Sequence, residues 1–133
     1  MIKESKMRPT NSTTFNIDTE ITPDSYEDLL KFFEMHYIAP KQTVFTNVKR
    51  TAIDHEHSLS FTFLGPENKW SIDVELKTGK PVQVKIVPSD ATVPHEALSQ
   101  LKEDLFIGVQ LFEEQVRRTS LYFSWVENEP VVP

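Results

Sequence analysis

The chain contains no cysteine and only three glycines among its 133 residues. Without cysteine it has no disulfide framework, no thiolate zinc site and no cysteine nucleophile, and a reducing cytoplasm is the expected compartment. The three glycines, Gly65, Gly79 and Gly108, are too few and too scattered for a dinucleotide-binding fingerprint or a Walker-type phosphate loop. We therefore expect no nucleotide or other cofactor.

Basic residues are also in the minority, with 14 Lys and Arg against 20 Asp and Glu, and the formal net charge is −6. Nucleic-acid-binding domains normally carry a basic patch, so nucleic acid is not an expected partner. Residues 1–8 are charged and lack the apolar core of a signal peptide, and no run of about 18 apolar residues occurs. Secretion and membrane spanning are not expected.

The apolar content is high enough for a folded core. Hydrophobic residues make up 38% of the chain and include nine phenylalanines, which offsets the loss of chain entropy on folding. The length is typical of one domain. We predict a flexible N-terminal tail at 1–14, a single α+β domain at 15–126 and a C-terminal tail at 127–133.

A first helix is predicted after Thr22. Thr22 is a suitable cap and Pro23 suits the first helical position. Apolar residues then recur at spacings of three and four, and Pro40 ends the pattern; the stripe comprises Tyr26, Leu29, Leu30, Phe33 and Tyr37. This helix is expected to pack on a sheet.

Alternating apolar and polar residues predict three strands of that sheet, at 58–63, 70–76 and 82–86. A run of β-branched and aromatic residues predicts another strand at 43–53, and residues 15–21 also alternate as a short edge strand would. Keeping the apolar residues on one face pairs Val74 with Val84 and Phe61 with Ile72, and places Asp73 across from Lys85. The predicted fold is an antiparallel β-meander of about four strands, packed on one face by a short N-terminal helix and a long C-terminal helix.

The long helix begins near Pro94 and bears more apolar surface than one face holds. Its main stripe is Leu98, Leu101, Leu105, Val109, Phe112 and Val116, and Phe106, Ile107 and Leu111 lie outside it. About 30 helical residues span about 45 Å, whereas a strand of about seven residues covers about 23 Å. The overhang must be covered by the first helix, by the N-terminal segment or by a second copy. Alternatively the helix stops near Thr119 and residues 121–126 form another strand.

The segment Asp54-His55-Glu56-His57 is the densest potential metal cluster, because His55 and His57 would share one face of a strand. No second pair of ligands has a recognisable spacing. The alternative is a polar turn between two strands, and this interpretation is preferred, so no metal is expected.

Three other groups of residues have a chemical and a structural interpretation. Asp73 and Glu75, with Ser71, suit acid–base work or a hard cation, but are equally typical of a solvated sheet face. Aromatic residues suit either a ligand pocket between sheet and long helix or a packed core; they are Phe61, Phe63, Trp70, Tyr122 and Trp125. Arg117 and Arg118 either contact an acidic partner or pair with the neighbouring glutamates.

No protease, hydrolase or kinase motif occurs in the chain, so catalytic residues cannot be named and an enzyme is not supported. The predicted function is a protein–protein interaction or assembly module, a homodimer through the long helix. The predicted interface residues are Phe106, Leu111, Leu121, Tyr122, Phe123 and Trp125. The alternative is a small-molecule carrier or minor enzyme with a pocket between sheet and helices.

Overall fold

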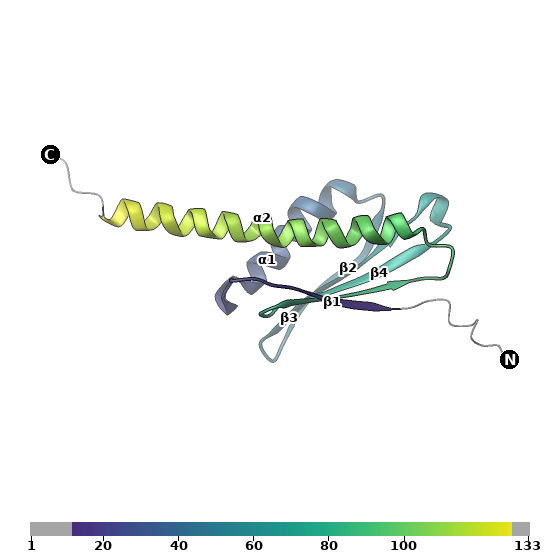
Figure 1. Cartoon of the computed structure of the whole chain (residues 1–133), viewed down its shortest axis with the longest axis horizontal. Helices are drawn as coiled ribbons and strands as arrows, with labels where there is room; N and C mark the ends of the chain where they lie inside the picture. The colour runs from purple at the N-terminus through teal and green to yellow at the C-terminus, as the bar shows by residue number, and fades with distance from the viewer. Residues whose placement is uncertain (1–11, 129–133) are drawn as a thin grey trace.

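A computed structural model describes residues 12–128 of the chain, with side chains through residue 119. A five-stranded antiparallel sheet has its two principal helices on the same face, and the other face is open (Figure 1). This confirms the predicted α+β class. Within the described residues, no helix combines the length and hydrophobicity that crossing a bilayer requires.

The sheet is a meander of four strands with one further strand added at its edge. The meander runs through β2 (Phe45–Ile53), β3 (Glu56–Leu64), β4 (Ser71–Lys77) and β5 (Val82–Pro88). The first strand that the structure describes is β1 (Thr13–Ile17), which pairs with β5 and gives the order β1-β5-β4-β3-β2. The sheet therefore has one strand more than the four predicted, because the segment near residue 15 pairs with the last strand of the meander.

The predicted pairing register is wrong by two residues. Val84 lies opposite Leu76, not Val74, and Phe61 lies opposite Val74, not Ile72. Lys85 consequently faces Glu75, whereas Asp73 faces Val87. A shift of two residues keeps every side chain on its own face of the sheet, so alternation alone cannot distinguish these registers and the connecting turns decide between them.

The first helical segment changes its winding along its length. A 3₁₀ turn, η2 (Pro23–Ser25), leads into α1 (Tyr26–Phe33), and a π-helical turn, η3 (Glu34–Ile38), and a 3₁₀ turn, η4 (Ala39–Lys41), follow. The predicted helix is present, but only its middle part is α-helical. Leu29, Leu30 and Phe33 are buried against the sheet, as their spacing predicts.

The C-terminal helix α2 (His95–Asn128) is continuous, so the alternative of a strand at 121–126 is wrong. Its 34 residues span about 51 Å at about 1.5 Å per residue. Leu101, Leu105, Val109 and Phe112 are buried, whereas Arg117, Arg118 and Thr119 are exposed. Figure 1 shows the yellow end of α2 extending past the sheet. The sheet-bound part of α2 therefore ends near Val116.

The space between sheet and helices is filled by side chains. Leu59, Leu76, Val84 and Ile86 from the sheet are fully buried, as is Leu105 from α2. The aromatic rings of the sheet also pack on one another, with the Phe45 and Phe61 centroids 5.3 Å apart. Packing of this kind is typical of a hydrophobic core, which is the structural interpretation of these aromatic residues.

Candidate interaction surface

Among the side chains of α2 that the structure describes, three large apolar ones are exposed to solvent. Phe106 is 49% exposed, Ile107 43% and Leu111 56%. Ile107 and Leu111 are four residues apart and lie on one helical face, whereas Phe106 is rotated from Ile107 by about 100°. Of the predicted interface residues, Leu111 therefore belongs to an apolar ridge that includes Ile107, and Phe106 lies apart from it.

The ridge borders a groove between α2 and the first helical segment. One hollow of about 320 Å³ is lined by Ile107 and Leu111 on one side and by Tyr37 on the other. A second hollow of about 570 Å³ lies toward the end of the sheet and includes Met35 and Val116. Both hollows are lined by Phe32 and His36. We call this combined surface the α1–α2 groove.

A glycine allows the two walls of the α1–α2 groove to approach each other. A Cβ atom built on Gly108 would lie only 2.4 Å from the ring of Phe33. Real carbon atoms do not approach so closely, so any side chain here would require the Phe33 ring or the two helices to shift. Gly108 and Phe33 therefore form the floor of the groove.

A partly buried hydrogen bond connects these two walls. The Tyr37 hydroxyl donates to Oδ2 of Asp104 at 3.0 Å, and Gln100 donates to Oδ1 of the same carboxylate at 2.9 Å. Burial raises the pKa of Tyr37 well above its usual range, and the charge and hydrogen bond of Asp104 raise this pKa further. The neutral hydroxyl is thus the favoured form, and the bond crosses from η3 to α2.

The predicted interface did not include the first helical segment, yet this segment supplies one wall of the groove. Met35 is 64% exposed, and the His36 ring lies 4.8 Å from that of Phe32. Both Met35 and His36 belong to the π-helical turn η3. π-Turns shift the helical phase and are frequent at functional sites, and the sequence periodicity gave no sign of this one.

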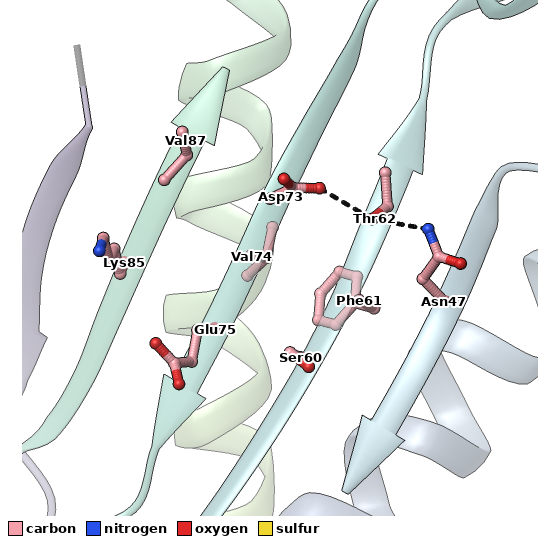
Figure 2. A pocket seen from close by; sticks show the side chains of 9 residues that line it. All are labelled: Asn47, Ser60, Phe61, Thr62, Asp73, Val74, Glu75, Lys85 and Val87. Carbon is pink, nitrogen blue, oxygen red and sulfur yellow. Dashed lines mark hydrogen bonds between the residues drawn. The ribbon is translucent and has the colours of Figure 1, made fainter. Parts of the chain in front are cut away.

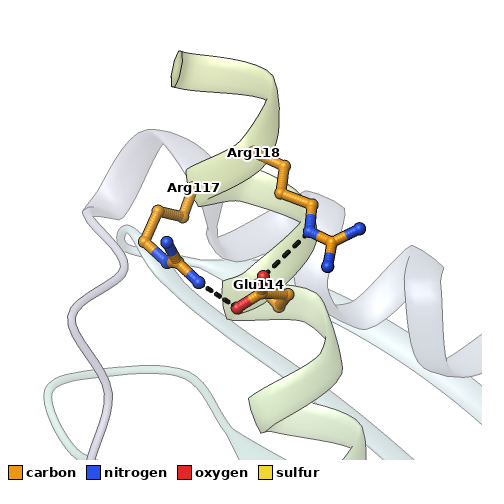
Figure 3. Close-up of polar contacts among 3 residues, drawn as sticks. All are labelled: Glu114, Arg117 and Arg118. Carbon is orange, nitrogen blue, oxygen red and sulfur yellow. Dashed lines mark hydrogen bonds and ion pairs between the residues drawn. The ribbon is translucent and has the colours of Figure 1, made fainter. Parts of the chain in front are cut away.

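A cluster of charges marks the point where α2 passes the end of the sheet. Glu114 accepts hydrogen bonds from both Arg117 and Arg118, and its bond to Arg118 Nε is 2.8 Å long (Figure 3). The bond to Arg118, followed by that to Arg117, lowers the pKa of Glu114. Of the two interpretations of these arginines, pairing with a neighbouring glutamate is the one that the structure shows. On another side of the helix, the Glu113 carboxylate accepts a hydrogen bond of 2.6 Å from the backbone N–H of Glu20.

The open face of the sheet has a polar hollow of about 340 Å³. In Figure 2 the Thr62 hydroxyl donates to Asp73 at 2.8 Å, and Asn47 donates to Thr62 at 3.4 Å. Asp73 and Glu75 are exposed on this face. Asn47 has a positive φ and lies in a β-bulge, which brings its side chain over Thr62. These contacts are typical of a solvated sheet surface.

The histidines that suggested a metal site lie in and beside a turn. Asp54 and His55 both have positive φ and connect Ile53 to Glu56, as in a two-residue hairpin turn, while His57 belongs to β3. The expectation that His55 and His57 share a strand face is therefore wrong. Among the side chains that the structure describes, no group of three or more His, Asp or Glu is placed to hold a metal ion.

The aromatic residues considered for a ligand pocket contribute to packing where they are described. Phe61 is buried, and the rings of Phe63 and Trp70 lie 5.9 Å apart. Trp70 covers Gly65, where a Cβ would meet the indole ring at 2.4 Å. The predicted interface residues Leu121, Tyr122, Phe123 and Trp125 lie beyond residue 119, outside the described side chains.

Comparisons with known protein families, with curated proteins and with solved structures found no match. What the protein does must therefore be inferred from its own surfaces, since a fold by itself does not define a function.

Proposed function

We propose that the protein is an assembly module that binds a second copy of itself through α2. The observation that supports this proposal is that α2 is buried along only part of its length and on only one face. Its inner face is buried by the sheet as far as Phe112, while its backbone continues to Asn128, past the end of the sheet. On its outer face Ile107 and Leu111 are exposed.

The sequence of the overhanging part supports the same proposal. Residues 121–126 read Leu-Tyr-Phe-Ser-Trp-Val, which is an apolar segment for a helix that has left its own sheet. Burying one large apolar side chain contributes about 1.5–3 kcal/mol. Association costs about 4–15 kcal/mol, so several such residues must be buried together from each copy. The apolar residues of the overhang, together with Ile107 and Leu111, are numerous enough for such a contact.

The cytoplasm is the compartment that we propose. A chain without cysteine needs no oxidising environment to reach its folded state, and an acidic net charge of −6 favours solubility. Fractionation of cells producing the tagged chain tests this proposal, and recovery in a membrane or exported fraction would contradict it.

The solution mass tests self-assembly directly. We expect light scattering across a concentration series to show a dimer, and we expect Leu111→Glu and Leu121→Glu to dissociate it, because each places a charge in the apolar contact. Ser99→Glu is the matched control, since Ser99 is exposed on the same helix at its sheet-bound end. Circular dichroism checks that the variants remain folded. A monomer at every concentration would overturn the proposal.

A further inference from the structure

The exposed face of α2 has a second periodicity, distinct from that of its buried stripe. Alternating steps of four and three connect Ile107, Leu111, Glu114, Arg118, Leu121 and Trp125. Alternating steps of four and three follow the heptad pattern of a two-stranded coiled coil. We call these six positions the seam. Ile107, Leu111 and Arg118 are exposed, and Glu114 is partly exposed.

The seam faces away from the sheet. Leu105 and Val109, which are fully buried, lie on the opposite side of the helix from Ile107 and Glu114. A second helix that lies on the seam therefore meets no strand of its partner. Positions 121 and 125 continue the seam along the overhanging backbone.

The seam is self-complementary when it is read in opposite directions. From either end its order is two apolar residues, two residues of opposite charge and two apolar residues. Positions equidistant from residue 116 form the pairs 107 with 125, 111 with 121, and 114 with 118. In a two-fold symmetric contact, residue i of one copy contacts residue j of the other and j contacts i. Every apolar position then meets an apolar position, and each Glu114 meets an Arg118.

A parallel pairing of the same helices has the opposite electrostatics. It would place Glu114 beside Glu114 of the second copy and Arg118 beside Arg118. Like charges facing each other oppose association, and charged residues at seam positions of this kind select one register and orientation. The pairs within one chain already show that these side chains reach each other, because Glu114 binds Arg118 across one helical turn (Figure 3).

We infer that two copies pair their α2 helices antiparallel about residue 116, with Ile107 and Leu111 of each copy against positions 125 and 121 of the other, and with Glu114 and Arg118 crossing between copies. This inference rests on the proposed self-assembly and specifies its geometry. Polar residues bound the seam, since one further step reaches Asp104 at one end and Asn128 at the other. The contact therefore has a defined length.

Charge reversal with mixing tests whether Glu114 and Arg118 cross between copies. Glu114→Arg alone and Arg118→Glu alone each place like charges in the contact, and we expect either change to raise the dimer dissociation constant at least about tenfold. In a mixed dimer of the two single variants, an Arg faces a Glu at both contacts between position 114 of one copy and position 118 of the other. The mixed pair should regain most of the original affinity, although neither chain regains the Glu114–Arg118 bond within its own helix. A mixture that associates no better than the separate variants would overturn the proposed contact between Glu114 of one copy and Arg118 of the other.

Disulfide trapping tests the register and uses the absence of native cysteine. A disulfide requires Cα atoms about 4.4–6.8 Å apart, whereas positions 111 and 121 of one helix are about 15 Å apart. We expect the double variant Leu111→Cys/Leu121→Cys to form a covalent dimer on mild oxidation. The single variants Leu111→Cys and Leu121→Cys are the matched controls and should remain largely uncrosslinked.

The two proposals fail in different ways. A chain that is monomeric at every concentration removes the self-assembly and this geometry together. A dimer that crosslinks through Leu111→Cys alone is parallel, and a dimer that crosslinks through neither the single nor the double variants uses another surface. Either of these dimers would overturn the antiparallel seam while leaving self-assembly in place.

Discussion

The two parts of α2 on either side of Val116 differ in what surrounds them. Before Val116 the helix has a sheet on one side, and Leu101, Leu105 and Val109 repeat with the spacing that buries them there. After Val116 the described side chains, Arg117 to Thr119, are exposed, although the following sequence is apolar again. The contrast teaches that one helix first closes a core and then continues past it, where we propose that it offers a surface to a second copy of the chain.

The largest effect is expected where α2 closes the core. Leu105→Ala removes a fully buried side chain, and we expect it to lower the free energy of unfolding by about 2–5 kcal/mol. Leu111→Ala, the same change at an exposed position, should alter monomer stability by less than about 0.5 kcal/mol while weakening the dimer. Urea denaturation at low protein concentration and light scattering measure the two effects. Equal losses of monomer stability would show that Leu111 also belongs to the core.

A smaller effect is expected at the bond that holds α2 to the first helical segment. Tyr37→Phe removes the hydrogen bond to Asp104 and should lower the free energy of unfolding by about 1–2 kcal/mol. The pKa of Tyr37 is raised on folding, so the unfolded chain loses this proton first, near pH 10, and stability falls as the pH rises further. The difference between wild type and Tyr37→Phe should therefore narrow above about pH 10.

The measurement is the urea midpoint of both proteins from pH 7 to about pH 11. Because the two chains differ only at residue 37, the difference between the curves isolates Tyr37. A difference that stays constant with pH would mean that Tyr37 does not ionise differently in the folded state.

The sequence predicted the elements of this fold better than their relations to one another. Alternation identified the strands β3 to β5 and the faces of their side chains, because a period of two directly reflects the pleat. The same alternation cannot distinguish Val84 opposite Val74 from Val84 opposite Leu76, since both registers bury the same residues. The pairing of β1 with β5 also joins distant segments, and no local pattern encodes it.

The candidate surface was partly visible in the sequence for the same reason. Leu111 could be selected because it departs from the buried stripe of a long helix. The opposite wall, which includes Met35 and His36, depends on the π-turn η3, and that turn shifts the phase without changing the apolar pattern that precedes it. The contact of Gly108 with Phe33 likewise depends on two helices whose approach only the folded chain defines.

That contact gives the smallest and most finely balanced prediction. Gly108→Ala gains about 1 kcal/mol of helix propensity, yet its new Cβ would lie 2.4 Å from the Phe33 ring, and overpacking costs about 1–3 kcal/mol. We expect a net loss of about 0–2 kcal/mol, in contrast to the gain that an unobstructed site would show. Adding Phe33→Leu should restore part of the loss because it reduces the obstructing ring. In a double-mutant cycle measured by urea denaturation, Gly108→Ala would then lower the free energy of unfolding less when residue 33 is Leu than when it is Phe. Independent, additive effects would show that the helices move apart freely, and the floor of the α1–α2 groove would then be set by other contacts.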